Sequence, residues 1–193
     1  MFVIVGLGNP EKKFRNTPHN IGKEILNFLQ TDWKKKYNFS NWKTTKKFKA
    51  QISKGKIGKK KVLLVKPLVF MNLSGETVSL IVSFFKIPSR NLIIVHDDID
   101  LTFGQLKISK NRGAAGHKGV LSIFKKIGTK NFIRIRVGVR PKSQKPKNLE
   151  TFVLKKFKRE DQKLVKKITV LCSQIIEIIV GHSLRKAMND FNK

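Results

Sequence analysis

Four polar residues follow apolar runs or begin predicted helices, positions where side chains often take part in chemistry. They are Asn9, His19, Asn72 and Asp97. An imidazole near its working pH can take a proton from water, and a carboxylate on the other ring nitrogen fixes its tautomer. Amides can orient a substrate and donate to a developing oxyanion. The set indicates a hydrolase that activates water, although such residues also cap turns and helices.

Other catalytic motifs are incomplete in this chain. The glycines at positions 6 and 8 begin like a dinucleotide-binding turn, but position 11 is Glu11 instead of a third glycine. The loop at 113–119 lacks the Ser or Thr that would follow Lys118 in a P-loop. Covalent catalysis has no obvious nucleophile, because G-x-S-x-G is absent and Cys172 lies beside an apolar helical stripe.

A metal site is a weaker interpretation than a metal-free one. The sequence has no H-E-x-x-H and only one cysteine, so metal ligands would have to converge from distant positions. The residues considered for such a site are His19, His96, Asp97 and His117. We therefore expect a site without a metal.

Composition predicts one basic domain that covers residues 1–193. The hydrophobic fraction of 40% suits a folded core. Lys and Arg number 42 against 12 Asp and Glu, a formal net charge of +30. This charge favours a polyanionic partner, with nucleic acid before an anionic membrane surface, although part of it can be compositional drift. With one cysteine, no signal peptide and no run of transmembrane length, we expect a cytoplasmic protein.

Strands and helices alternate along the chain. Apolar runs and period-two alternation predict strands at 2–5, 62–65, 92–95, 105–109 and 133–139. Helical spacing predicts helices at 19–28, after Ser74 as N-cap, after 119, at 164–178 and at 184–192. Residues 48–65 form a hairpin pattern, so the sheet is expected to be mixed. Strand ends are where ligands bind in such α/β folds.

Two further segments have open interpretations. Residues 31–47 are basic and interleaved with the aromatics Trp33, Tyr37, Phe39 and Trp42. Such a segment can stack on nucleic acid bases, but aromatics packing an irregular loop on the core are more frequent. Residues 141–146 form a basic linker rich in Pro and Ser.

Several motifs resemble those of the bacterial-type peptidyl-tRNA hydrolase family. They are V-G-L-G-N-P at 5–10, H-N at 19–20, F-M-N-L-S-G at 70–75, H-D-D-I-D-L at 96–101, G-A-A-G-H-K-G at 113–119, F-I-R-I-R-V-G-V at 132–139 and F-V-L at 152–154. The resemblance covers essentially the whole chain. It implies hydrolysis of the ester between a peptide and tRNA, and a single three-layer α/β/α domain with a mixed, twisted sheet. It also implies a monomer that needs no cofactor and no obligate protein partner.

The resemblance assigns roles to individual residues. It implies that His19 is the general base for water and that Asp97 orients it. The residues that it places in substrate or tRNA binding are Asn9, Phe14, Phe70, Met71, Asn72, Lys118 and Arg136. Asn9 and Asn72 match amides that position the substrate, Met71 matches an apolar wall, and Arg136 matches one of two basic residues that hold a tRNA phosphate.

The chain departs from the family pattern at several of these positions. Glu11 stands where the family usually has Gly, Phe14 where it has Tyr, Pro18 where it has Arg and Lys118 where it has Asn. The second phosphate-binding position falls on a serine, Ser109, with lysines at 107 and 110 nearby. The substitution at 118 leaves open a non-catalytic RNA-binding protein on the same scaffold, as in relatives that act in splicing. The retained histidine, aspartate and asparagines favour the enzyme.

Overall fold

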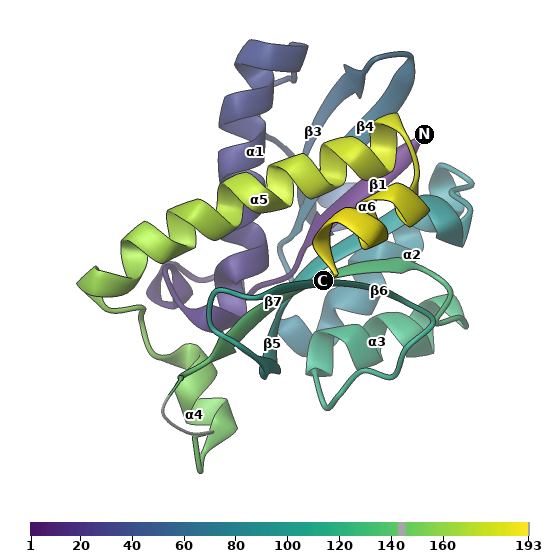
Figure 1. The fold of residues 1–193 in the computed structure, drawn as a ribbon. Helices are drawn as coiled ribbons and strands as arrows, with labels where there is room; N and C mark the ends of the chain where they lie inside the picture. Colours follow the sequence, from purple (N-terminus) through teal and green to yellow (C-terminus); the bar gives the residue numbers. More distant parts are fainter. Residues whose placement is uncertain (143–145, 193) are drawn as a thin grey trace.

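The structure is a computed structural model that describes residues 1–142 and 146–192, and it contains one seven-stranded sheet (Figure 1). The strands are β1 (Phe2–Gly6), β2 (Lys43–Thr45), β3 (Ala50–Ile57), β4 (Lys60–Pro67), β5 (Leu92–Thr102), β6 (Leu106–Lys110) and β7 (Ile133–Arg140). The α-helices are α1 (Ile21–Tyr37), α2 (Ser74–Phe84), α3 (Lys118–Ile127), α4 (Leu149–Leu154), α5 (Gln162–Gly181) and α6 (Leu184–Phe191). The middle of the expected linker at 141–146, residues 143–145, lies outside the described residues.

The strand order is β2-β3-β4-β1-β5-β7-β6. The central strands β4, β1, β5 and β7 are parallel, whereas β2, β3 and β6 add antiparallel pairs at the two edges. The expected mixed sheet and the expected hairpin, β3 with β4, are therefore confirmed. Because the four central strands are parallel, their carboxyl ends meet at one edge of the sheet, where the following loops can build a site.

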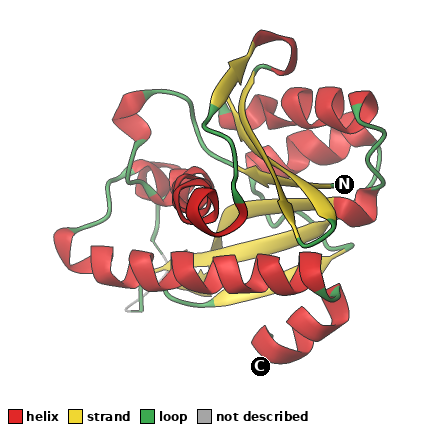
Figure 2. Cartoon of the chain, turned by 90° about the horizontal axis from the view of Figure 1, so that it is seen from above, coloured by secondary structure: helices red, strands yellow, loops and turns green. Residues whose placement is uncertain are grey.

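Helices cover both faces of the sheet (Figure 2). Successive residues of β1 point to opposite faces, so Val3 and Val5 join a core with α2 and α3, while Ile4 joins a core with α1, α5 and α6. This arrangement confirms the expected three-layer α/β/α fold. Among the described helices, none has both the length and the apolar character needed to cross a membrane.

The start of α1 lies directly against the sheet. A Cβ atom on Gly6 would collide with the carbonyl oxygen of Gly22, and one on Gly22 would collide with that of Val95. The two glycines therefore permit a close backbone approach, which the Lys23 N–H strengthens by donating to the Leu7 carbonyl at 3.1 Å. The turn before α1, which carries His19, is fixed against β1 and β5 as a result.

Three expectations about local structure were wrong. The first helix does not stop near residue 28 but continues to Tyr37, so Trp33 is a helical residue. Of the two interpretations of the aromatic segment, packing on the core is confirmed for Trp33 and Phe39, which are buried, and Phe39 lies in the loop after α1. Ser74 is the first residue of α2 and not its N-cap, and its hydroxyl donates to the Met71 carbonyl at 2.8 Å. Asp97 lies inside β5, which runs on to Thr102, and not in a loop after it.

Candidate active site

His19 and Asp97 form the centre of the site. His19 lies on the short 3-10 turn Pro18–Asn20, and its Nδ1 is 3.1 Å from both carboxylate oxygens of Asp97. The two side chains are only 14% and 5% exposed. With Nδ1 donating to the carboxylate, Nε2 is the ring nitrogen that remains for a substrate or a water molecule. This is the geometry of a general base with an orienting carboxylate.

Burial and the close contact act in opposite directions on the pKa of His19. Burial lowers the pKa of this imidazole, but the charge and the hydrogen bond of Asp97 outweigh it and raise the pKa above its usual value, while Lys118 opposes that rise. For Asp97, burial alone would raise the pKa of the carboxyl, but its contacts with His19 and His117 hold it far below its usual range. Asp97 is therefore an anion at neutral pH, and it stabilises a positive charge on His19.

A second histidine, His117, also contacts Asp97. From its sequence motif, His117 was expected only as a candidate metal ligand. Its Nε2 is 2.9 Å from Asp97 Oδ1, and its Nδ1 accepts the N–H groups of Gly119 and Val120 at 3.2 and 3.3 Å. Because Nδ1 is an acceptor, the hydrogen-bond network assigns the ring proton to Nε2, which donates to Asp97. His117 thus caps α3 and fixes the carboxylate at the same time.

Two buried side chains, His96 and Arg134, support the arrangement of Asp97 and His117. His96 donates from Nδ1 to the Asp97 carbonyl at 2.7 Å, and its ring lies 4.7 Å from that of His117. Burial and the neighbouring His117 hold the pKa of His96 well below its usual value, so it is neutral. Arg134 on β7 donates to the carbonyls of Arg112 and Gly113 at 3.0 and 2.9 Å, which holds the loop that leads to His117.

Three of the four residues considered as metal ligands converge. The ligand atoms of His19, Asp97 and His117 lie within 4.8 Å of one another. Their mutual hydrogen bonds, together with the bond from His117 to α3, already satisfy most of these atoms. Binding a metal would require the two imidazoles to give up their contacts with Asp97, so the metal-free interpretation stays our prediction.

Asn9 connects two of the loops around the site. Its Oδ1 accepts the Met71 N–H at 2.9 Å, and its backbone is held on both sides by the Asn20 side chain at 2.8 and 3.0 Å. With Oδ1 occupied, the amide N–H groups of Asn9 are the donors left for a ligand. The H-N pair at 19–20 therefore has two separate tasks: His19 contacts Asp97, and Asn20 positions Asn9.

A pocket with a volume of about 470 Å³ opens above these residues. Seven of the nine predicted site residues line it, namely Asn9, His19, Phe70, Met71, Asn72, Asp97 and Lys118. We call the side formed by Asn9, His19, Asp97 and His117 the sheet wall. The opposite side is formed by Leu149, Glu150, Val153 and Leu154, and we call it the α4 wall.

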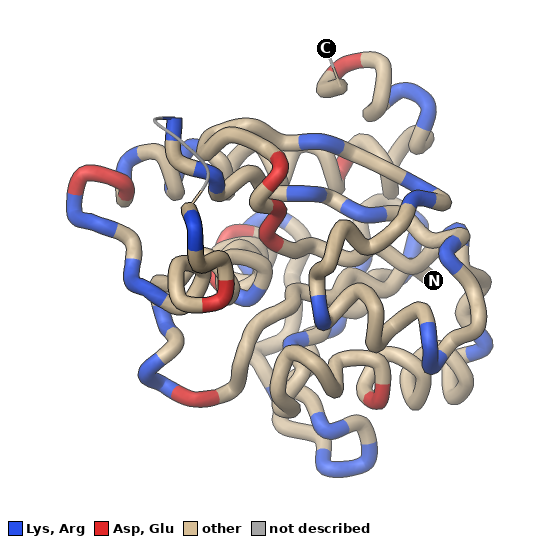
Figure 3. Tube along the Cα trace, turned by 90° about the horizontal axis from the view of Figure 1, so that it is seen from below, with Lys and Arg blue, Asp and Glu red and all other residues tan. Residues whose placement is uncertain are grey.

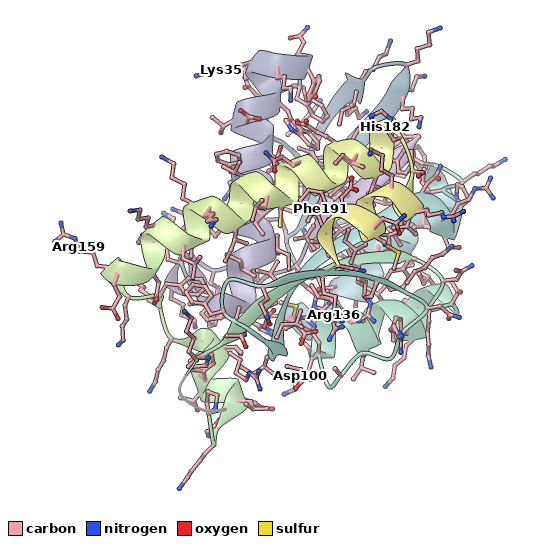
Figure 4. The ribbon with its side chains drawn as sticks, in the orientation of Figure 1. Lys35, Asp100, Arg136, Arg159, His182 and Phe191 are labelled. Carbon is pink, nitrogen blue, oxygen red and sulfur yellow. The ribbon has the colours of Figure 1, made fainter. Side chains whose placement is uncertain are left out.

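The two remaining predicted residues do not line this pocket. Phe14 lies on the basic loop before His19, with Lys13 Nζ 5.0 Å from its ring centre. Arg136 lies on β7 (Figure 4), and its Nε donates to Asp98 at 2.6 Å. Lys107 lies opposite Arg136 in the antiparallel pair of β6 and β7. A phosphate contact at this place would therefore lie outside the pocket.

Lys118 contacts the α4 wall. Its Nζ is 2.6 Å from Glu150 Oε1, and the two side chains are 62% and 77% exposed. The pair connects the start of α3 with α4 across the pocket. The α4 helix itself was not predicted, since its six residues are too short for a helical period to be recognised.

Comparisons with known proteins identify the family of the chain. The family model described as peptidyl-tRNA hydrolase matches residues 3–193. The peptidyl-tRNA hydrolase of Clostridium novyi is 40% identical over 192 residues, which cover 100% of this chain and 98% of that protein. The peptidyl-tRNA hydrolase of Clostridium perfringens is also 40% identical, over 100% of this chain and 97% of that protein. The crystal structure of the Acinetobacter baumannii peptidyl-tRNA hydrolase superimposes with a TM-score of 0.89 at 29% identity, covering 100% of this chain and 94% of the other. With its sequence and its fold in agreement, the chain belongs to the peptidyl-tRNA hydrolase family.

Proposed function

We propose that this peptidyl-tRNA hydrolase cleaves the ester between peptide and tRNA with His19 as the general base. The observation that carries the proposal is the buried contact between His19 Nδ1 and Asp97, which leaves Nε2 as the free ring nitrogen of a residue that lines the pocket. Nε2 takes a proton from water as the water oxygen attacks the ester carbonyl. Asp97 stabilises the imidazolium that forms, and the imidazolium then gives its proton to the departing ribose oxygen.

Asn9 and Asn72 act on the substrate in this proposal. The Asn9 amide is held rigidly by Met71 and Asn20, so its remaining N–H groups have a fixed direction. Asn72 is exposed at the pocket and can turn toward a bound ester. Donors in fixed positions stabilise the oxyanion of the tetrahedral intermediate. Met71 and the half-exposed Phe70 offer apolar surface to the peptide part.

His19→Ala tests this mechanism directly. We expect it to abolish the release of peptide from N-blocked peptidyl-tRNA, while the affinity for tRNA stays nearly unchanged, because a general base acts in the transition state. The wild type is the essential control. A wild-type protein that binds tRNA and releases no peptide would leave the non-catalytic RNA-binding function as the better description.

Arg136 is our proposed contact to a tRNA phosphate, with Lys107 beside it as a second cation. Basic residues lie over much of the chain, with acidic residues at a few places (Figure 3), so charge alone does not select this position. Arg136→Ala is expected to weaken tRNA binding and to lower the slope of log K against log salt by about 0.9. The exposed Arg185 on α6 supplies the matched control, Arg185→Ala. An unchanged slope would remove Arg136 from tRNA binding.

We further propose that the protein acts as a monomer without a metal. The metal-free part rests on the hydrogen bonds that already engage the possible ligand atoms of His19, Asp97 and His117. Light scattering of the purified protein at assay concentration tests the first point. Retention of activity after treatment with a strong chelator tests the second, and loss that zinc or magnesium restores would refute it.

A further inference from the structure

A second cavity lies on the other side of α4 from the active-site pocket. Its volume is about 510 Å³, within the range typical of small-molecule sites. Its apolar part contains three aromatic rings, from Phe103 after β5, Phe152 on α4 and Phe157 after α4. The rings of Phe103 and Phe157 stack with their centres 5.3 Å apart and their planes at 15°. The cavity therefore has an aromatic surface that a flat ligand can use.

The charged residues around this cavity are predominantly basic. Four lysines line it, Lys142, Lys155, Lys156 and Lys158, against two acids, Glu160 and Asp161. Both acids already contact Lys158. The backbone N–H of Lys158 donates to the Asp161 carboxylate at 2.8 Å, and the Lys158 Nζ is 3.3 Å from Glu160. Among the described residues, no acidic side chain pairs with the other three lysines. Three cations are thus available to an anionic ligand.

The cavity is a direct neighbour of the active-site pocket. Pro18 lines the cavity, and the next residue, His19, lines the pocket. Helix α4 likewise contributes Phe152 to the cavity and Val153 to the pocket. In Figure 1, α4 lies at the end of the molecule opposite the turn between β3 and β4. Because adjacent residues line the two cavities, only the 3-10 turn Pro18–Asn20 and helix α4 separate a ligand group in the second cavity from His19.

We propose that this cavity binds a nucleotide of the single-stranded 3′ end of the substrate RNA, next to the terminal ribose that carries the ester. The proposal rests on the proposed function, which places that ester at His19. Aromatic rings that stack bases, together with lysines that contact phosphates, are the general means by which proteins hold single-stranded RNA. A peptide side chain would gain from the rings but would not use the three lysines, so the nucleotide fits the cavity better.

The test measures binding of a 5′-phosphorylated RNA trinucleotide with the sequence of the tRNA 3′ end, by calorimetry over a range of salt concentrations. Phe157→Leu keeps apolar bulk and removes the ring, so we expect the Kd to rise about tenfold. Lys155→Ala with Lys156→Ala changes only exposed side chains, and we expect the salt slope to fall by about 1.4, or 0.7 for each phosphate contact. Lys59→Ala with Lys61→Ala, on the distant turn between β3 and β4 and at the start of β4, is the matched control and is expected to leave both values unchanged.

Hydrolysis assays of the same variants provide the second measurement. We expect KM for N-blocked peptidyl-tRNA to rise in both cavity variants while kcat stays constant, because the nucleotide contact is the same in the ground and transition states. Cavity variants that bind the trinucleotide and the substrate like the control overturn the proposal. So does a KM effect that depends on the peptide and not on the RNA. A wild type without peptide release would refute the proposed function, whereas the calorimetric result judges the cavity without any need for catalysis.

Discussion

The two walls of the active-site pocket are built in opposite ways. On the sheet wall, His19, Asp97 and His117 are at most 14% exposed, and hydrogen bonds connect them to one another and to the backbone of α3. The α4 wall belongs to a helix of six residues, and its polar contact to the rest of the pocket is the exposed pair of Lys118 and Glu150. A buried, satisfied network holds one geometry, whereas an exposed ion pair breaks easily in water. We infer that the sheet wall determines the rate of the chemical step and that the α4 wall adjusts access and charge.

Asp97→Asn should have the largest effect if this comparison is right. The amide keeps the size of the side chain, but it removes the negative charge that stabilises the His19 imidazolium and disturbs its tautomer. By analogy with the orienting aspartate of a serine protease triad, kcat should fall by about 10³–10⁴-fold. Single-turnover release of peptide measures it, and Asp32→Asn on α1 is the control. A loss below tenfold would show that Asp97 does not orient the base.

His117→Asn separates the two tasks of this histidine and should have an intermediate effect. Asparagine is a good N-cap, so the free energy of unfolding should change by less than about 1 kcal/mol. The shorter side chain cannot keep the contact with Asp97, and losing a hydrogen bond to a charged group corresponds to roughly 10- to 100-fold in kcat. Denaturant unfolding and turnover are measured together.

The control for that experiment is His182→Asn, which replaces a histidine at the end of α5, far from the pocket (Figure 4). Equal kcat values for the His117 and His182 variants would mean that His117 serves only the helix. A large loss of stability in the His117 variant would mean that the asparagine fails to replace the cap.

Variants of the exposed pair Lys118 and Glu150 should give the smallest effect. The two variants should shift the acidic limb of the pH profile in opposite directions. A general base works when deprotonated, so activity falls as pH drops through the pKa of His19, which lies above its usual value. Lys118 lowers this pKa by repulsion, so Lys118→Asn should move the acidic limb of kcat/KM to higher pH. Glu150→Gln removes the counter-charge of Lys118 and should move the limb to lower pH.

Both shifts should change kcat/KM by less than about fivefold at fixed pH, and they should shrink as salt is added, because the pair is exposed. Full pH profiles at low and high salt provide the measurement. Shifts of the same sign in the two variants, or shifts that salt does not reduce, would contradict an electrostatic effect of the α4 wall on His19.

The elements that carry a clear apolar pattern were predictable from the sequence. The short helix α4 and the contacts between residues far apart in the sequence were not. The apolar run of β1 and the stripe of α5 follow from side-chain periodicity, and they define the three-layer fold. The basic aromatic segment left two interpretations open, and the structure decides for core packing, because Trp33 and Phe39 are buried by α5 and the sheet, which lie far away in the sequence. Tertiary packing in this case outweighs the local signal of the lysines around them.

The sequence by itself determined the kinds of residue at the site and the strand and helix pattern that carries them. Histidine, aspartate and two asparagines close to apolar runs are local facts, and so is the alternation that assigns each strand residue to a face. Only the tertiary structure decided that Asp97 is shared by two histidines, 78 and 20 positions away. Contacts between residues so far apart depend on which strands pair and on how closely α1 and α3 approach the sheet. No local pattern specifies those distances, and the same holds for the cavity beside α4.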